Sequence, residues 1–164
     1  MDLFVAHFSN RVDAKGRVSI PAPFRAVLTR DGFEGLFVTP SLDADALDCG
    51  GNALLREIAD LIERQPPYSP ERDLFSTALY GRSETLKVDG EGRMVLSDTI
   101  RDHARITGEV TFVGQGQKFQ IWEPSRFRAH LEEATLRLRA LRTQHGDRDA
   151  GGGPSTPRPP GARE

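Results

Sequence analysis

A six-residue pattern occurs twice in this chain, at positions 76 residues apart. Residues 12–17 read VDAKGR and residues 88–93 read VDGEGR, and a short apolar run follows each. Both copies keep Val-Asp-x-x-Gly-Arg, so an acid and a base stand four residues apart around a glycine. A repeated apolar run needs only a shared core, whereas a repeated Asp and Arg at fixed spacing indicates a shared turn. The chain is therefore predicted to fold from two similar halves.

The similarity between the halves extends beyond this pattern. At the same offset, identical residues occupy six pairs of positions: Val12 and Val88, Asp13 and Asp89, Gly16 and Gly92, Arg17 and Arg93, Arg25 and Arg101, Gly32 and Gly108. Each copy has roughly 44 residues, which is near the size below which a domain rarely folds alone. We therefore predict that the two copies share one β core, like a dimer contained in a single chain.

Apolar periodicity and turn residues predict the order of the elements. The predicted β-hairpins cover 3–20 and 83–96, the helices 21–32, 53–64, 70–80, 97–108 and 125–142, and the further strands 35–39, 109–114 and 118–123. Asn52, Ser69 and Ser97 are the predicted N-caps. Residues 40–51 are predicted to be a loop. The segment after 142 ends in GGGPSTPRPPGARE and is predicted to be disordered.

The Asp and Arg of the repeated pattern allow two interpretations. In the structural one, the carboxylate accepts hydrogen bonds from the turn's N–H groups and pairs with the guanidinium four residues later. In the functional one, the carboxylate holds the guanidinium so that it meets a phosphate or the edge of a guanine. The residues alone leave both interpretations open.

The distribution of charge distinguishes the two copies. The whole chain carries a net charge of -2, but residues 7–30 contain five basic side chains and only one acidic one, Asp13. Residues 83–105 contain four basic and five acidic side chains, with Glu91 standing where the first copy has Lys15. The first copy is therefore the better predicted surface for a polyanion, and the second is predicted to give support or subunit contact.

Other classes of function find little support in the sequence. The chain has one cysteine, Cys49, and four scattered histidines without metal-ligand spacing, so no metal site or other cofactor is predicted. No nucleophile or phosphate-loop motif occurs, and Phe119 and Trp122 are expected in the core, so no enzyme is predicted. No apolar stretch is long enough to span a bilayer. We therefore expect a cytoplasmic protein without a membrane partner.

Three segments together resemble the MraZ family of bacterial transcriptional regulators: VDAKGRVSIPAPFR, VDGEGRMVL and VGQGQKFQIWEPSRF. The resemblance covers residues 3 to about 142. It implies an α+β, mainly β, fold in which two intertwined SpoVT-AbrB-type repeats form a β-barrel-like core with connecting helices. It also implies a homo-oligomer, ring-shaped as in the family. It further implies that the protein is nucleoid-associated and binds double-stranded DNA at direct repeats in the promoter of its own operon, a division and cell-wall gene cluster.

The resemblance and the charge distribution together predict the site and the domains. The DNA-contacting loop of the family corresponds to Asp13, Lys15 and Arg17, and the second motif to Asp89 and Arg93, for which a structural role is expected. Local positive charge adds Arg11 and Arg25 to the predicted DNA-binding residues. The predicted domains are 7–54 and 83–126 (the two SpoVT-AbrB domains), 55–82 (a helical connector), 127–142 (a C-terminal helix) and 143–164 (a disordered tail).

Two alternatives to a DNA-binding regulator stay open at this point. An antidote-type protein of similar fold would bind a protein partner through its C-terminal segment. A purely structural oligomer would use the same fold as a scaffold and would show no salt-dependent affinity for DNA.

Overall fold

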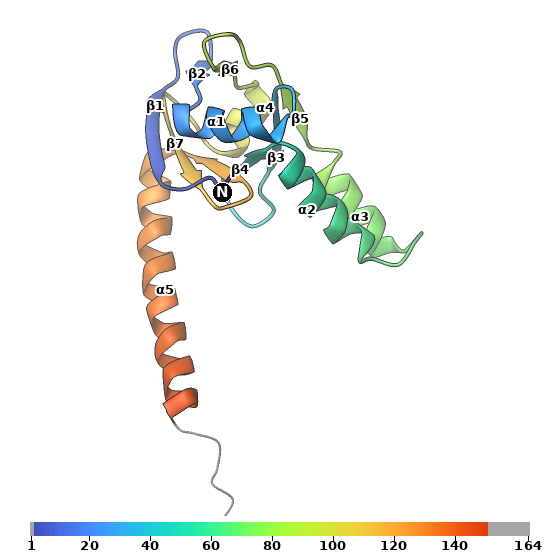
Figure 1. Ribbon diagram of the computed structural model, residues 1–164, viewed down its shortest axis with the longest axis vertical. Coiled ribbons are helices and arrows are strands. Elements are labelled where there is room, and N and C mark those ends of the chain that lie inside the picture. The colour runs from blue at the N-terminus through green and yellow to red at the C-terminus, as the bar shows by residue number, and fades with distance from the viewer. Residues whose placement is uncertain (1, 151–164) are drawn as a thin grey trace, which may run out of the picture. The chain divides into compact units, whose positions relative to one another are not determined.

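The computed structural model describes the backbone of residues 2–150 and the side chains of residues 2–146. It contains helices and strands in an α+β arrangement, which confirms the predicted class (Figure 1). The helices are α1 (Ala22–Asp31), α2 (Asn52–Glu63), α3 (Pro70–Leu79), α4 (Asp98–His103) and α5 (Pro124–Ala150). The strands are β1 (His7–Arg11), β2 (Arg17–Ser19), β3 (Leu36–Pro40), β4 (Leu47–Gly50), β5 (Glu84–Leu86), β6 (Arg93–Val95), β7 (Glu109–Gly114) and β8 (Phe119–Trp122).

The strands form one six-stranded antiparallel sheet and a separate two-stranded ribbon. The order in the sheet is β1-β7-β8-β4-β3-β5, and the ribbon consists of β2 and β6. Within the described residues the sheet ends at β1 and β5, so it does not close into the predicted barrel. Four of the pairings, β1 with β7, β2 with β6, β3 with β5 and β4 with β8, join a strand of the first half to one of the second.

The two predicted hairpins are wrong, although their strands and turns are present. β1 pairs with β7 rather than β2, and β5 pairs with β3 rather than β6. In the ribbon, Val18 lies opposite Met94, and both side chains are 1% exposed. Alternation of apolar and polar residues sets which face of a strand is buried but does not identify its partner. The strands separate beyond each turn because pairing across the halves buries both apolar faces.

The prediction of a loop over 40–51 is also wrong, because residues 47–50 form β4 between β3 and β8. Asp48 made this segment resemble a loop. Its carboxylate lies 3.3 Å from the Lys118 ammonium and accepts a 2.7 Å hydrogen bond from the amide of Gln120. Neighbouring Leu47 and Cys49 are fully buried. A charge that is paired in this way can lie within a sheet, but its partners are about 70 residues away in the sequence.

Two of the three predicted N-caps are confirmed. The hydroxyl of Ser69 accepts a hydrogen bond from the N–H of Arg72, and the hydroxyl of Ser97 accepts one from Ile100. Asn52 is instead the first residue of α2. The N–H groups at the start of α2 donate their hydrogen bonds to a residue of another helix, α1. The carboxylate of Asp31, at the end of α1, accepts hydrogen bonds of 2.6 Å from Asn52 and 3.0 Å from the N–H of Ala53.

The main core lies between the sheet, the ribbon and helices α1 and α4. Phe24 of α1 is 1% exposed and contacts four aromatic rings, those of Phe4, Phe8, Phe112 and Phe119. Phe112 and Phe119 belong to β7 and β8, so this cluster joins the halves. Phe119 and Trp122 lie in the core as predicted, and the Trp122 ring contacts Phe127.

Contacts divide the chain after Phe127, and α5 spans the division. Phe127 is 5% exposed, whereas Leu131, Leu138 and Leu141, which follow it along α5, are 44–57% exposed. The helix continues to Ala150, beyond the predicted end near Arg142. Residues 143–164 were predicted to be disordered, and most of them, residues 151–164, lie outside the described residues. Among the described helices, none is long and apolar enough to cross a membrane.

Candidate nucleic-acid interface

The first Asp-x-x-Gly-Arg loop connects β1 to β2 and is organised by Asp13. One carboxylate oxygen accepts hydrogen bonds from the N–H groups of Lys15 (2.9 Å) and Arg17 (2.8 Å). The other oxygen accepts a 2.7 Å hydrogen bond from the Nε–H of Arg17. Gly16 has φ +80°, a conformation that favours glycine. The spacing of four residues therefore produces both a turn and an ion pair.

The second loop, between β5 and β6, repeats this geometry. Asp89 accepts hydrogen bonds from the N–H groups of Glu91 (2.9 Å) and Arg93 (3.0 Å), and its second oxygen accepts one of 2.9 Å from the Nε–H of Arg93. Gly92 has φ +79°. The backbone and the Asp–Arg pair are thus alike in the two loops, and any difference in their chemistry comes from other side chains.

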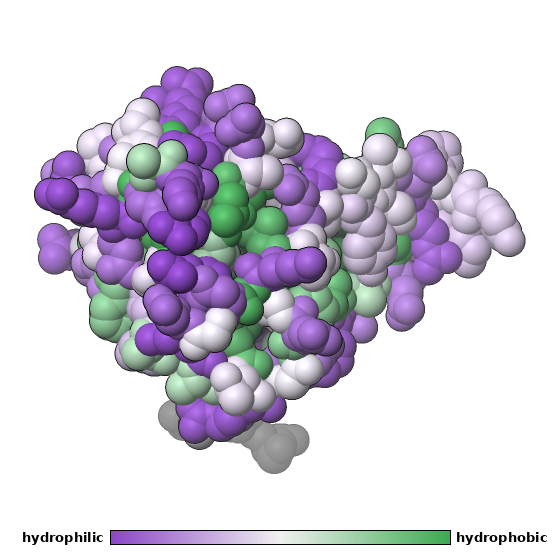
Figure 2. All heavy atoms as spheres, turned by 90° about the horizontal axis from the view of Figure 1, so that it is seen from above, coloured by the Kyte–Doolittle hydropathy of each residue, from purple (hydrophilic) through white to green (hydrophobic). Residues whose placement is uncertain are grey.

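The ribbon brings the two loops together. β2 begins at Arg17, directly after the first loop, and β6 begins at Arg93, directly after the second. Each glycine carbonyl accepts a hydrogen bond from the other half: Gly16 from the N–H of Leu96 (3.1 Å) and Gly92 from that of Ile20 (2.9 Å). Both loops lie at the same end of this unit (Figure 1). Seen from that end, the surface shows hydrophilic side chains with a strip of hydrophobic ones between them (Figure 2).

The first loop presents basic groups that no described residue fully neutralises. Asp13 binds the Nε–H of Arg17, and no residue in the described part of the chain binds its two terminal nitrogens. The Arg17 side chain is 35% exposed. Lys15 at the tip and Arg11 at the end of β1 are exposed, and neither side chain forms an ion pair with a described residue. These three side chains can therefore meet an anion without breaking an existing contact.

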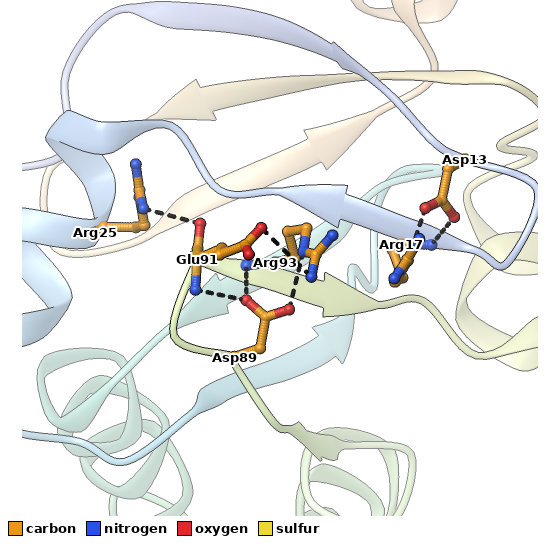
Figure 3. Close-up of polar contacts among 6 residues, drawn as sticks. All are labelled: Asp13, Arg17, Arg25, Asp89, Glu91 and Arg93. Atoms are coloured by element: carbon orange, nitrogen blue, oxygen red, sulfur yellow. Dashed lines mark hydrogen bonds and ion pairs between the residues drawn. The ribbon is translucent and has the colours of Figure 1, made fainter.

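The basic groups of the second loop are already engaged (Figure 3). Arg93 is bonded to Asp89, and its Nη2 lies 3.5 Å from a carboxylate oxygen of Glu91. The hydrogen bond and charge of Asp89, followed by the charge of Glu91, raise the pKa of Arg93 above its ordinary value. Arg25 of α1 donates a 3.1 Å hydrogen bond to the backbone carbonyl of Glu91. The structure therefore places Arg25, predicted with the first loop, against the second.

Arg25 and its repeat equivalent Arg101 each lie beside the loop of the other half. A Cβ added at Gly92 would overlap the side chain of Arg25, and one added at Gly16 would lie 3.6 Å from Nη1 of Arg101. Arg101 donates a 2.9 Å hydrogen bond to the carbonyl of Thr107. Arg101 was not among the residues predicted to lie near the first loop. The identity of Arg25 and Arg101 in the repeat could have indicated this placement, but only together with the exchange of strands.

Acid should weaken the fold through these two aspartates. Backbone and side-chain hydrogen bonds from Arg17 lower the pKa of Asp13 below its ordinary value of 3.8, and those from the Arg93 and Glu91 backbone, with the Arg93 side chain, do the same for Asp89. A lowered pKa in the folded state means that ionisation favours folding. The contribution is complete above the unfolded-state pKa and is lost as the pH falls through the lowered one.

We therefore expect the melting temperature of the parent to exceed that of an Asp13→Asn/Asp89→Asn double variant by a constant amount above about pH 5. The difference should shrink below about pH 4, where the parent also becomes protonated. Thermal unfolding between these extremes measures it. A difference as large at pH 3 as at pH 7 would show that the carboxylate charges do not contribute in this way.

The described residues offer no alternative constellation for metal chemistry. No group of three or more His, Cys, Asp or Glu side chains among them is placed to hold a metal ion. Cys49 is fully buried, and this burial raises the pKa of its thiol well above the ordinary value. The two loops are therefore the part of the described structure in which charged groups are most clearly organised.

Comparison with known proteins identifies the family. The model of the family described as "MraZ protein, putative antitoxin-like" matches residues 79–149. A Beijerinckia indica protein named "Transcriptional regulator MraZ" is 66% identical over 164 residues, covering 100% of both chains. Proteins of the same name from Xanthobacter autotrophicus and Rickettsia bellii are 60% and 40% identical, over 90% and 82% of this chain and 94% and 90% of their own. The chain belongs to the MraZ family.

Proposed function

We propose that this protein is a DNA-binding transcriptional regulator that recognises direct repeats in the promoter of its own operon, a division and cell-wall gene cluster, and is nucleoid-associated. The observation that carries the proposal is the first loop, where Arg17 is held by Asp13 and, with Lys15 and Arg11, forms no ion pair with any other carboxylate of the described residues. The names of the relatives support transcriptional regulation. The narrower target follows from the family resemblance.

In the proposed mechanism, Asp13 does not itself bind DNA but positions Arg17. The bond to Nε fixes the plane of the guanidinium and leaves the terminal nitrogens to bind the edge of a guanine or a phosphate. Lys15 and Arg11 bind the sugar–phosphate backbone and set the register of the loop. Arg25 contributes indirectly, because it donates its hydrogen bond to the second loop.

We further propose that the two halves are intertwined SpoVT-AbrB repeats that share one β core, bounded by residues 7–54 and 83–126. The four pairings between the halves support this organisation. One first loop has too few basic groups for tight binding, so a homo-oligomer, proposed to be a ring, would present several loops to repeated DNA boxes. Linked loops gain affinity because binding of one raises the effective concentration of the others.

A mobility-shift titration on the DNA upstream of the gene tests the proposal, with unrelated duplex as competitor and at two salt concentrations. We expect competitor-resistant binding whose logarithmic affinity falls with the logarithm of salt by about 0.9 for each phosphate contacted. Light scattering on the same samples gives the number of subunits bound. Binding no tighter than to the unrelated duplex would overturn promoter recognition.

A second candidate function is the binding of a protein partner through α5. The family description "putative antitoxin-like" supports it, and so do the exposed leucines 131, 136, 138 and 141 of this helix. Truncation after Phe127 distinguishes the two candidates. A regulator that reads DNA through the first loop keeps the contacts of that loop, whereas a protein-binding antidote loses its partner.

A further inference from the structure

Two loops of the same backbone geometry lie at one end of the first unit, yet the side chains around their arginines differ in charge and contacts. Resting on the proposed function, we infer that Glu91 is a specificity-determining residue that closes the second loop to the DNA backbone. Arg25 positions Glu91 for this role. Each subunit then offers one DNA-binding loop rather than two, and the side chain at a single equivalent position, Lys15 or Glu91, decides which loop binds.

The backbone cannot be the source of the difference. In both loops one carboxylate oxygen accepts two N–H groups at 2.8–3.0 Å, and the other accepts the Nε–H of the arginine at 2.7–2.9 Å. Both glycines have φ near +80°. The arginines are also similarly accessible, at 35% for Arg17 and 33% for Arg93. A phosphate would therefore meet the same backbone turn and the same Asp–Arg pair at each loop.

The charge at the tip differs. Glu91 is 75% exposed and its carboxylate lies 3.5 Å from Nη2 of Arg93. Arg93 thus has two carboxylates beside its guanidinium, whereas Arg17 has one. A phosphate approaching Arg93 must displace Glu91 and also face its negative charge. At the first loop the equivalent side chain is the ammonium of Lys15, which attracts the same phosphate.

The second loop is also held in place from outside. Nη1 of Arg25 binds the carbonyl of Glu91 at 3.1 Å, and the side chain of Arg25 lies directly against Gly92. Nε of Arg25 is buried without a hydrogen-bond partner among the described residues. The equivalent Arg101 binds Thr107 instead of the tip of the first loop. Arg25 therefore donates a hydrogen bond to the backbone of Glu91. This bond holds the tip of the second loop and keeps the Glu91 carboxylate near Arg93.

The ribbon explains why closing one loop matters for recognition. β2 and β6 pair antiparallel over three residues each, so the two loops flank this short ribbon at its two ends. Three residues of a strand span only about 10 Å, so we expect a duplex bound at the first loop to have phosphates within reach of the second. If both loops were basic, phosphate contacts unrelated to sequence would increase and discrimination between DNA sequences would fall.

The test compares Glu91→Lys with Glu57→Lys, which makes the same change of charge at an exposed position of α2. The probes are an unrelated random-sequence duplex and the upstream DNA, titrated at several salt concentrations. We expect Glu91→Lys to bind the random duplex about tenfold more tightly than Glu57→Lys, with a salt slope steeper by about 0.9 to 1.8, which corresponds to one or two added phosphates. The preference for upstream DNA should fall. Equal affinities and slopes for the two variants would overturn the inference.

Two further variants keep the result interpretable. Glu91→Gln retains the size of the side chain and should show a smaller gain in the same direction, so it serves if Glu91→Lys does not fold. Arg17→Ala/Glu91→Lys should recover binding to the random duplex that Arg17→Ala alone has lost, because the second loop replaces the first. Failure of the parent to prefer upstream DNA would overturn the proposed function, whereas absence of recovery in the double variant would overturn only the role of Glu91.

Discussion

Arg17→Ala is expected to weaken binding to promoter DNA by about 5- to 150-fold for each loop that contacts a guanine, the range of one good bidentate pair. Removal of the guanidinium takes away the donors that Asp13 orients, and it leaves the Asp13 carboxylate facing the DNA without its partner. In the proposed oligomer several subunits bind together, so the loss for the whole assembly should exceed that for one loop. The titration with upstream DNA, repeated at two salt concentrations, measures it.

Arg93→Ala is the matched control for this variant. It deletes the same side chain from a turn of the same geometry, and it breaks an Asp–Arg pair of nearly the same length, 2.9 Å against 2.7 Å. It should therefore share any effect on folding but leave DNA affinity close to that of the parent. Melting temperatures of both variants check the first point. Equal DNA affinity of Arg17→Ala and the parent would contradict the assignment of the first loop.

Arg17→Lys separates the two ways in which Arg17 could act. Lysine keeps the positive charge but cannot form the bidentate contact with guanine. If Arg17 reads a base, the lysine variant should lose preference for the upstream DNA while it keeps affinity for unrelated duplex. If Arg17 binds a phosphate, both affinities should fall by a similar factor.

The sequence predicted the local structure of the loops because their interactions are local. Asp13 and Arg17 are four residues apart, and the turn between them depends on Gly16, so spacing and residue type were sufficient. The helices α1, α3 and α4 were predicted for the same reason, since their apolar faces lie within each segment and, for α3 and α4, the capping serines lie beside it. The difference in charge between Lys15 and Glu91 is also evident from the sequence alone, although the contacts of Glu91 with Arg93 and Arg25 are not.

The pairing of strands could not be predicted, because it depends on contacts between distant residues. The alternation in Arg17–Ser19 is satisfied equally by β1 or β6 as a partner, and only the packed core selects β6. The same limit explains Arg25, whose partner is the carbonyl of Glu91, 66 residues away. It also explains β4, where Asp48 is compensated from β8 and from Lys118. Because the strands pair across the two halves, Arg25 lies against the second loop and not, as was predicted, against the first.

Phe24→Ala is expected to lower the free energy of unfolding by about 3–5 kcal/mol, the usual cost of removing a buried phenylalanine ring. Phe24 is 1% exposed, and its ring centroid lies 5.0–6.5 Å from those of Phe4, Phe8, Phe112 and Phe119. These rings surround the site, so the cavity cannot close easily. Urea unfolding measures the change, and the variants are compared at one protein concentration because the stability of the proposed oligomer would depend on it. Leu74→Ala on α3, where the side chain is 68% exposed, is the control and should change stability by no more than about 0.5 kcal/mol.

The form of the unfolding curve carries as much information as its midpoint. Phe24 comes from the first half, whereas Phe112 and Phe119 come from the second, and four strand pairings cross between the halves. Neither half can therefore keep its sheet after the other has unfolded. Phe24→Ala should shift a single transition that is the same for fluorescence of Trp122, in the second half, and for far-ultraviolet circular dichroism. Two separated transitions, with Trp122 reporting only the more stable one, would show that the halves fold independently and would contradict the proposed shared core.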